Sequence, residues 1–334
     1  MQKYSYNCID KSIILPYFKK YYVALFFKLV PKWLTANFIT LISTSFMLLI
    51  LFMSIKFPDL STELFAALFA FCIHAYVVGD HLDGMQAKET NTGSALGEFF
   101  DHYLDVYNGA IVFFVLTILF RPLPDELFYL FMFFSCIAFA ATNMEELERN
   151  ELIFGYLGTL EGLIVLFFFL ISWVVPEIRG WWQQEMLFGY PNYYIMIFGL
   201  GLGYVATVVD IFLRLKYSPI QFNVFVICST ILAYILFTMH LDHMIGWLIL
   251  MLYCGEYIAK VMRSYLLSQK HQYPDRIITV LICLICINHF IQIIPELNVR
   301  WILISAIVYL SLKVVWLFGL TIFNLRSHWY WVNP

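Results

Sequence analysis

Four aspartates, placed at helical spacing on two neighbouring apolar segments, are the residues of this sequence best suited to chemistry. Asp80 and Asp83 are three residues apart near the end of one segment, and Asp101 and Asp105 are four apart in the next. Residues three or four apart share one face of a helix. Because the polar stretch 89–94 turns the chain between the segments, an antiparallel helix pair is predicted to point all four carboxylates toward one another.

Four carboxylates in a medium of low dielectric constant repel one another and lose their hydration, so they need cations nearby. Mg²⁺ suits such a site because it binds carboxylate oxygens, keeps some of its water and accepts substrate phosphates. Two such ions a few ångströms apart can clamp a phosphoryl group together with its leaving group. We therefore predict a phosphate site with two Mg²⁺, which Mn²⁺ could replace. The predicted metal ligands are Asp80, Asp83, Asp101 and Asp105.

Small and basic residues share these helix faces. Gly84, Ala87 and Gly97 would leave space for a nucleotide beside the backbone, and Lys88 supplies a positive charge. The alternative is that the acids serve a sodium or proton transporter, because single aspartates inside membrane helices often relay protons. Four acids at two coherent spacings, next to Lys88 and His102, favour the site for metal and phosphate.

The composition places this site in a membrane. Of 334 residues, 62% are hydrophobic and 13% are charged, whereas soluble domains have roughly 45–50% and about 25%. A water-soluble protein is therefore excluded, and the net charge of −3 offers no basic excess for nucleic acid. A membrane helix needs about 20 mostly apolar residues. Ten such segments are predicted, near 38–56, 62–85, 96–120, 125–145, 152–175, 192–213, 220–239, 243–264, 277–294 and 301–324.

These segments predict an all-α fold, a polytopic membrane helix bundle of about ten transmembrane helices. We expect one domain over 1–334, with its active-site helix pair at 62–120. Residues 14–34 mix lysines with aromatic and aliphatic residues, which favours an amphipathic helix at the membrane surface. A short solvated arm is the alternative reading of that segment.

The distribution of lysine and arginine predicts the orientation. Most of them fall on the side that carries the N-terminus. The opposite side holds Lys56, Arg121, Arg179 and Arg300. The positive-inside rule then puts both termini and the four aspartates on the cytoplasmic side. The membrane would be a bacterial inner membrane or an endoplasmic reticulum.

The residues around the aspartates resemble the signature of the CDP-alcohol phosphotransferases. The matching pattern is Asp80-x-x-Asp83-Gly84-x-x-Ala87-Lys88, then eight residues, then Gly97-x-x-x-Asp101-x-x-x-Asp105. One position differs, because the family has arginine after the alanine. Lys88 keeps the positive charge there but cannot form the bidentate contact of a guanidinium. The stretches 83–102 and 31–40 are most similar to the choline and ethanolamine phosphotransferases.

This resemblance implies a reaction and its partners. Such an enzyme moves phosphocholine or phosphoethanolamine from CDP-choline or CDP-ethanolamine to the hydroxyl of diacylglycerol and releases CMP. It works in the lipid bilayer, and the family likeness suggests a homodimer. The residues expected to contact the nucleotide and its diphosphate are Asn37, Gly84, Ala87, Lys88 and Gly97.

A lipid hydroxyl is a poor nucleophile and needs a base. His102 is the first candidate, because histidine titrates near the working pH. Glu161, an acid that the family likeness also places in an apolar segment, would orient His102 or accept its proton. Asp105 is the competing base, since the last aspartate is a candidate elsewhere in the family. The structural alternatives are that His102 only completes a polar network and that Glu161 pairs helices.

Two other functions stay open. A related enzyme could join CDP-diacylglycerol to a soluble alcohol of the inositol or glycerol phosphate type. It would need basic residues to bind an anionic acceptor, and Lys88 is the one evident near the site. A cation-coupled transporter would be expected to show inverted repeats with interrupted helices, and the sequence gives no sign of them.

Overall fold

The computed structural model describes residues 7–120, 123–156, 158–187 and 189–326. Within these residues nearly all regular structure is helical, as predicted, and the strands are two or three residues long. The chain forms two compact units. The N-terminal unit consists mainly of residues up to 121 and 154–203, and the C-terminal unit of 122–153 and 204–327.

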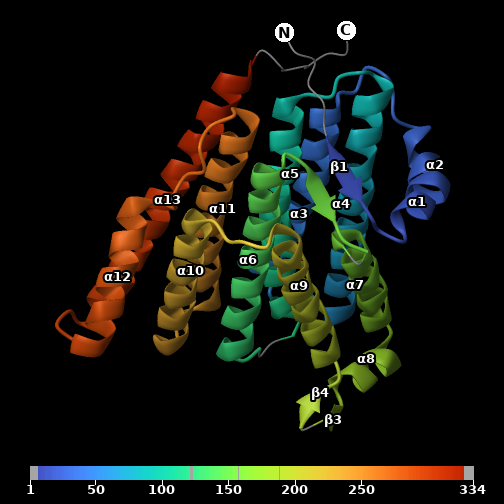
Figure 1. The fold of residues 1–334 in the computed structure, drawn as a ribbon. Coiled ribbons are helices and arrows are strands. Elements are labelled where there is room, and N and C mark those ends of the chain that lie inside the picture. Colours follow the sequence, from blue (N-terminus) through green and yellow to red (C-terminus); the bar gives the residue numbers. More distant parts are fainter. Residues whose placement is uncertain (1–6, 121–122, 157, 188, 327–334) are drawn as a thin grey trace. The chain divides into compact units, whose positions relative to one another are not determined.

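The N-terminal unit is built around one long helix (Figure 1). Its elements are β1 (Cys8–Asp10), α1 (Leu15–Tyr17), η1 (Phe18–Val23), α2 (Ala24–Phe27), α3 (Ala36–Lys56), α4 (Thr62–Glu89), α5 (Ala95–Leu119), α7 (Thr159–Val174), α8 (Pro176–Gln183), β3 (Glu185–Leu187) and β4 (Tyr190–Pro191). Helix α4 contacts α3, α5 and α7. Because it is central, residues on several of its faces are buried.

Short polar residues begin the two helices that carry the aspartates. The Ser61 hydroxyl accepts the backbone N–H of Leu64 at the start of α4, and the Ser94 hydroxyl accepts that of Gly97 at the start of α5. Helices α3 and α4 approach closely at Gly79, where an added Cβ would lie 2.5 Å from Cβ of Ser43. Glycine is required there because any larger side chain would push the helices apart.

The predicted surface helix over 14–34 is shorter than expected. Helical structure covers Leu15–Tyr17, Phe18–Val23 and Ala24–Phe27, and the chain then turns. Proline at position 31 cannot donate a backbone hydrogen bond and restricts the residue before it. The side-chain amide of Gln86 donates to the carbonyl oxygens of Pro31 and Leu34, so the segment before α3 is attached to α4.

The predicted fifth span, 152–175, begins too early. Residues Leu152–Phe154 form strand β2, and helix α7 begins at Thr159. The reason is a cap that hydropathy does not reveal. The backbone of Gly158 is extended, and the Glu161 carboxylate accepts its N–H at 2.8 Å, which starts the helix at this point.

The C-terminal unit is organised around α11. Its helices are α6 (Asp125–Arg149), α10 (Ile220–Thr238), α11 (His243–Leu266), α12 (Arg276–Ile291) and α13 (Glu296–Leu325). Strand β2 and helix α9 (Tyr194–Leu215) run from one unit into the other. Helix α11 contacts α6, α10 and α13 and is the most completely buried of the apolar helices. Arg214, at the end of α9, forms a two-pronged ion pair with the buried Glu145 of α6.

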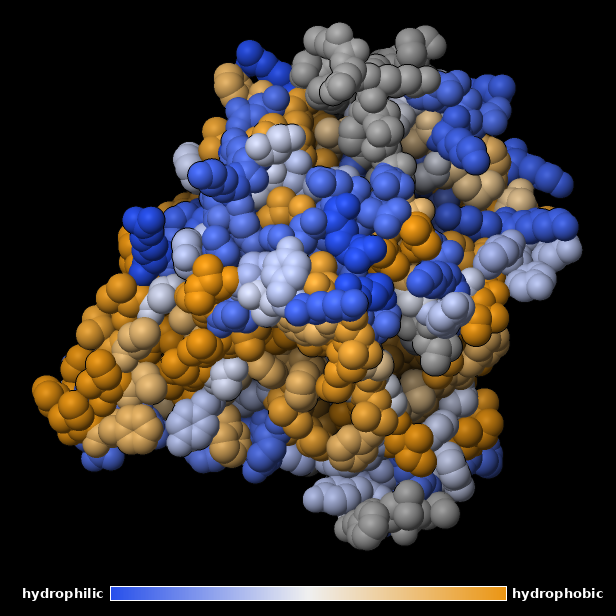
Figure 2. All heavy atoms as spheres, in the orientation of Figure 1, coloured by the Kyte–Doolittle hydropathy of each residue, from blue (hydrophilic) through white to orange (hydrophobic). Residues whose placement is uncertain are grey.

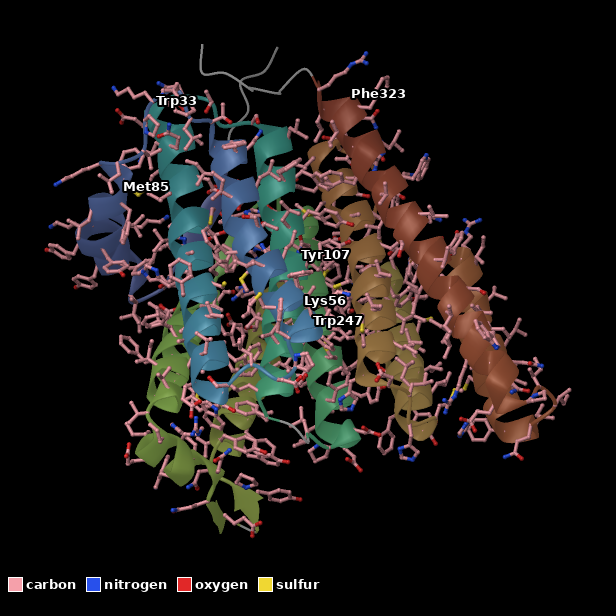
Figure 3. All side chains as sticks on the ribbon, turned by 180° about the vertical axis from the view of Figure 1, so that it is seen from behind. Trp33, Lys56, Met85, Tyr107, Trp247 and Phe323 are labelled. Atoms are coloured by element: carbon pink, nitrogen blue, oxygen red, sulfur yellow. The ribbon has the colours of Figure 1, made fainter. Side chains whose placement is uncertain are left out.

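A helix lies at each of the ten predicted spans. In the described residues, eight of them are long and apolar enough to cross a membrane, and a ninth span results if the bent pair α7 and α8 is counted as one. The remaining one, α12, has 16 residues. Apolar side chains are exposed on these helices, as Figure 2 shows over α12 and α10. Figure 3 labels Lys56, the last residue of α3, and Trp33, which lies three residues before this helix begins. The all-α membrane fold is thereby confirmed.

Candidate active site on α4 and α5

The turn between α4 and α5 sets the relation of the four aspartates. At the end of α4, the backbone N–H groups of Thr90 and Thr92 donate to the carbonyl oxygens of Gln86 and Ala87, each at 2.9 Å. Asn91 follows with a φ of 53°, a conformation that asparagine tolerates better than most residues. The reversal is completed within five residues, so the acids at the end of α4 face those at the start of α5.

Three of the aspartates converge. Asp80, Asp101 and Asp105 each offer a carboxylate oxygen, and these oxygens lie within 4.8 Å of one another. Ligands of one divalent cation satisfy this limit, since each lies about 2.0–2.6 Å from the ion. Oδ1 of Asp101 is buried and has no hydrogen-bond partner among the residues described. Such an orphaned oxygen is costly, so the arrangement fits a divalent cation bound by these carboxylates.

The fourth aspartate has a different neighbour. Asp83, one turn further along α4, is buried, and its Oδ2 accepts a hydrogen bond of 2.5 Å from the Thr40 hydroxyl of α3. It is not part of the group of three carboxylates that could share a cation. Asp83 therefore lies beside the converged acids and connects them to α3.

Asp105 also has a fixed partner. The Tyr76 hydroxyl donates to its Oδ1 at 2.6 Å. Tyr76 lies four residues before Asp80 and therefore on the same face of α4. A hydrogen bond to an ionised carboxylate is about twice as strong as a neutral one. The hydrogen bond from Tyr76 therefore holds the Asp105 carboxylate of α5 toward α4.

The residues expected to contact the nucleotide lie around these acids. Oδ1 of Asn37 lies 3.2 Å from the position that a Cβ on Gly97 would take, so these two are neighbours at the contact of α3 with α5. An added Cβ at Gly84 would meet nothing within 4 Å, which leaves open space beside Asp83. Ala87 is half-buried. Lys88 is exposed at the end of α4.

The candidate bases differ in their surroundings. His102 is half-buried on α5, and its Nε2 lies 3.9 Å from Oδ2 of Asp101. Glu161, at the start of α7, accepts hydrogen bonds from the Ser12 hydroxyl at 2.5 Å and from the N–H of Ile14 at 3.3 Å, besides that of Gly158. Its contacts are those of a helix cap that holds the N-terminal segment, and its predicted role beside His102 stays a prediction.

Sequence reasoning missed three supporting residues. Tyr76 was identifiable, because it falls on the periodicity that found Asp80. On an ideal helix, His81 projects about 100° away from Asp80, yet its Nδ1 lies 3.0 Å from Oδ2 of Asp80 because the side chain turns back toward the preceding residue. Thr40 ends the 31–40 stretch of the resemblance, but its partner Asp83 is 43 residues away, so no local pattern pairs them.

Fold and site together define a class: all-α integral membrane proteins that gather carboxylates between two neighbouring helices, where they could hold metal ions. The chain belongs to one family within it. The model of the CDP-alcohol phosphatidyltransferase family matches residues 33–205, which include every residue of the carboxylate cluster. Enzymes of that family are in general metal-dependent.

Curated relatives carry more than one activity in their names. The chain is 29% identical to choline/ethanolaminephosphotransferase 1 of Arabidopsis thaliana, over 56% of this chain and 48% of that protein. It is 26% identical to ethanolaminephosphotransferase 1 of Mus musculus, over 54% and 49%. It is also 28% identical to a CDP-diacylglycerol–serine O-phosphatidyltransferase of Encephalitozoon cuniculi, over 49% and 44%. The matched part spans about half the length of these relatives.

Proposed function

We propose that this protein transfers phosphocholine or phosphoethanolamine from a CDP-alcohol to the hydroxyl of diacylglycerol and releases CMP. The observation that carries the proposal is the convergence of Asp80, Asp101 and Asp105 within 4.8 Å, beside the open space at Gly84. A diphosphate needs compensation of its negative charge, and a nucleotide needs room next to the backbone. The relatives from Arabidopsis and mouse support this choice of donor.

The chain's own residues would bind and orient the donor. Asn37 and Gly97 border the cytidine, with Gly84 and Ala87 leaving space along α4, and the exposed Lys88 meets the diphosphate. Two Mg²⁺, or Mn²⁺, held by the four aspartates would neutralise the charge that builds on the phosphoryl oxygens and on CMP. Tyr76 and Thr40 keep two of those carboxylates in place.

The transfer itself needs one proton acceptor. The hydroxyl oxygen of diacylglycerol forms a bond to the β-phosphorus, and the bond from this phosphorus to the bridging oxygen breaks as CMP leaves. We assign the hydroxyl proton to His102, because Asp105 accepts the Tyr76 hydroxyl and would be a ligand of the bound cation. Asp105 is the second candidate for this role.

A donor panel tests the proposal. Purified full-length protein in liposomes with diacylglycerol and Mg²⁺ is offered radiolabelled CDP-choline, CDP-ethanolamine or CDP-diacylglycerol, the last with soluble alcohols, and CMP release is measured. We expect release with one of the first two donors and loss of at least 100-fold in Asp101→Asn, since such charge-stabilising groups contribute about 10²–10³ in rate. Asp59→Asn, an exposed acid between α3 and α4, is the matched control.

The relative from Encephalitozoon favours a second candidate function, the transfer of a phosphatidyl group from CDP-diacylglycerol to a soluble alcohol. Release of CMP with that donor alone would replace our proposal by this one. A cation-coupled transporter would instead move ions across sealed vesicles without cleaving any nucleotide. If Asp101→Asn keeps full activity, the proposed active site is wrong, whichever donor the enzyme uses.

We further propose that both termini and the active site face the cytoplasm and that the protein acts as a homodimer. The excess of lysine and arginine on one side supports the orientation. Mass measurement of the detergent-solubilised protein tests the homodimer.

A further inference from the structure

A cavity lined mainly by polar and charged residues lies in the C-terminal unit. None of the proposed catalytic or substrate-binding residues lines it. Its volume is about 580 Å³. The loop after α11 and the start of α12 form one wall, Lys260 projects from α11, and Tyr309 and Lys313 project from α13. Because four lysine and arginine side chains line it against a single carboxylate, its charge is the first property to explain.

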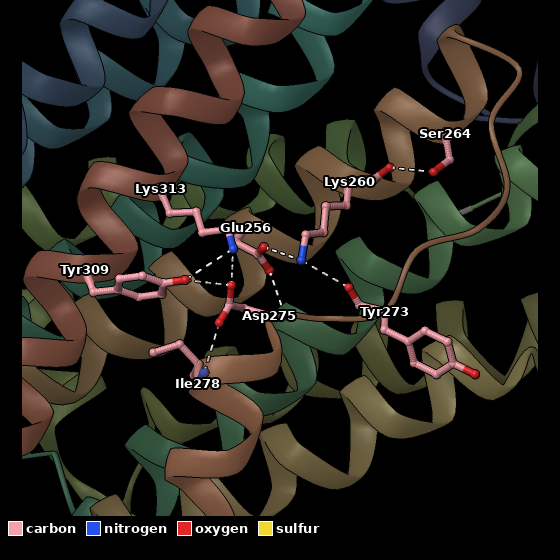
Figure 4. A network of polar contacts seen from close by, with 8 residues as sticks. All are labelled: Glu256, Lys260, Ser264, Tyr273, Asp275, Ile278, Tyr309 and Lys313. Carbon is pink, nitrogen blue, oxygen red and sulfur yellow. Dashed lines mark hydrogen bonds and ion pairs between the residues drawn. The ribbon is translucent and has the colours of Figure 1, made fainter.

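Two acids next to the lining lysines already have partners (Figure 4). Glu256 of α11 pairs with Lys260 at 2.6 Å. Asp275 pairs with Lys313 and accepts the Tyr309 hydroxyl at 3.0 Å. Both acids are almost fully buried. The two lysine–carboxylate pairs are therefore close to neutral.

Two cations that line the cavity lack an acid. Lys270 and Arg276 line the cavity, are exposed, and form no ion pair with any described residue. The cavity therefore has an excess of positive charge that an anion would relieve.

An apolar stripe begins at the same cavity. Ile277 lines it and is 62% exposed, and Val280, Leu284 and Ile287 continue along the same face of α12 with more than half of each side chain exposed. A soluble anion would gain nothing from this stripe, whereas the acyl chains of a lipid would cover it. Basic pockets between membrane helices are known to hold lipid head groups.

We propose that this cavity binds an anionic phospholipid. Lys270 and Arg276 contact its phosphate at the entrance, the paired Lys260 and Lys313 lie beneath, and the acyl chains lie along the stripe from Ile277. The site is additional to the proposed reaction and does not depend on it, because neither the donor nor its aspartates take part.

The test measures binding to the full-length protein in detergent by native mass spectrometry. The probes are phosphatidylglycerol, which carries one negative charge, and zwitterionic phosphatidylcholine. The variants are Arg276→Gln and Lys270→Gln, which leave both buried ion pairs intact, and the matched control is Arg300→Gln at the other end of α13. Each cation near a lipid surface contributes about 1 kcal/mol, so each variant should bind phosphatidylglycerol about fivefold more weakly. The control Arg300→Gln should bind it as tightly as the wild type does.

Three results would overturn the proposal. One is equal affinity for the two lipids, and another is unchanged phosphatidylglycerol affinity in both variants. The third concerns the source of the phosphate. If millimolar inorganic phosphate displaces the lipid from the wild type but not from Arg276→Gln, the cavity holds a soluble anion. Should one variant fail to fold, as judged by its unfolding temperature in phosphatidylcholine nanodiscs, the other still decides the matter.

Discussion

The carboxylate of Asp105 is held from two sides. One oxygen accepts the Tyr76 hydroxyl, and the carboxylate also belongs to the group of three that converge within 4.8 Å. A carboxylate with these contacts is well placed to bind a cation, and once it did so its oxygens would be occupied and less available to take up a proton. This is the physical reason for assigning the proton to His102, whose Nε2 lies 3.9 Å from Oδ2 of Asp101.

Removing the Tyr76 hydroxyl should weaken the reaction while keeping the fold. Tyr76→Phe retains the ring but leaves Asp105 without its donor, and hydrogen bonds to charged groups contribute about 1.5–3 kcal/mol. We expect CMP release to fall roughly 10- to 100-fold. Tyr129→Phe is the control, because it loses a bond to the backbone carbonyl of Leu241 and should stay near wild-type activity. Unchanged release in Tyr76→Phe would refute this positioning role.

Helical spacing accounts for the convergence of Asp80, Asp101 and Asp105, but not for Asp83, which was expected to join them and lies outside that group. Asp101 and Asp105, like Tyr76 and Asp80, share a face because they are four residues apart. The contacts of Thr40 with Asp83 and of Ser12 with Glu161 join residues 43 and 149 positions apart. Such pairs depend on how helices are arranged in space, and a single sequence holds no local signal for them.

At the scale of the element, the approach of α3 to α4 at Gly79 determines where the acids lie. Gly79→Ala would place a methyl group 2.5 Å from Cβ of Ser43. Overpacking of this kind costs about 1–3 kcal/mol, so we expect a lower unfolding temperature and reduced CMP release, since Asp80 is the next residue. Circular dichroism during heating and the release assay measure the two effects.

A second substitution at the contact between Gly79 and Ser43 should reverse the effect of the first. Ser43→Gly removes the Cβ that the new methyl group would meet, so the double variant with Gly79→Ala should recover most of both losses. Gly199→Ala in α9, where an added Cβ meets nothing within 4 Å, is the matched control. If Gly79→Ala alone is as stable and active as the wild type, the packing of α3 against α4 does not depend on a glycine at this position.

The loop between α11 and α12 should make stability depend on pH. Burial lowers the pKa of His271 below its usual 6.5, and the hydrogen bond with Glu148 offsets this only in part. Tyr257 contacts the other ring nitrogen at 2.9 Å. The folded protein therefore binds the proton less readily than the unfolded chain. Stability is complete above about pH 6.5 and is lost as pH falls, by at most about 1.4 kcal/mol per unit.

Unfolding temperatures between pH 7.5 and 5 test this sign. The wild type should lose stability on acidification, and His271→Gln should lose less, because a glutamine takes up no proton. The matched control is His289→Gln in α12, where the histidine is half-buried. Its unfolding temperature should change with pH as that of the wild type does. A His271→Gln curve parallel to that of the wild type would contradict the role of this residue.

For the whole molecule, hydropathy located every apolar segment but not which of them cross the membrane. Helix α12 has 16 residues and is about 24 Å long, whereas the hydrocarbon core is about 30 Å thick. A helix this short crosses if the bilayer thins or if flanking side chains extend to the interface. Arg276 and Arg300 stand on either side of it. The predicted ten spans require these two arginines to lie on opposite faces of the membrane.

Cysteine labelling in intact cells distinguishes a topology in which α12 crosses the membrane from one in which it does not. We expect Lys216→Cys, in the loop after α9, to react with a membrane-impermeant maleimide only after permeabilisation, because its charge places it in the cytoplasm. Arg300→Cys should react in intact cells if α12 crosses. Wild-type protein measures the background from the native cysteines, of which Cys283 is exposed. If Arg300→Cys reacts only after permeabilisation, α12 returns to the side from which it starts, and the bundle has one span fewer than its hydropathy predicts.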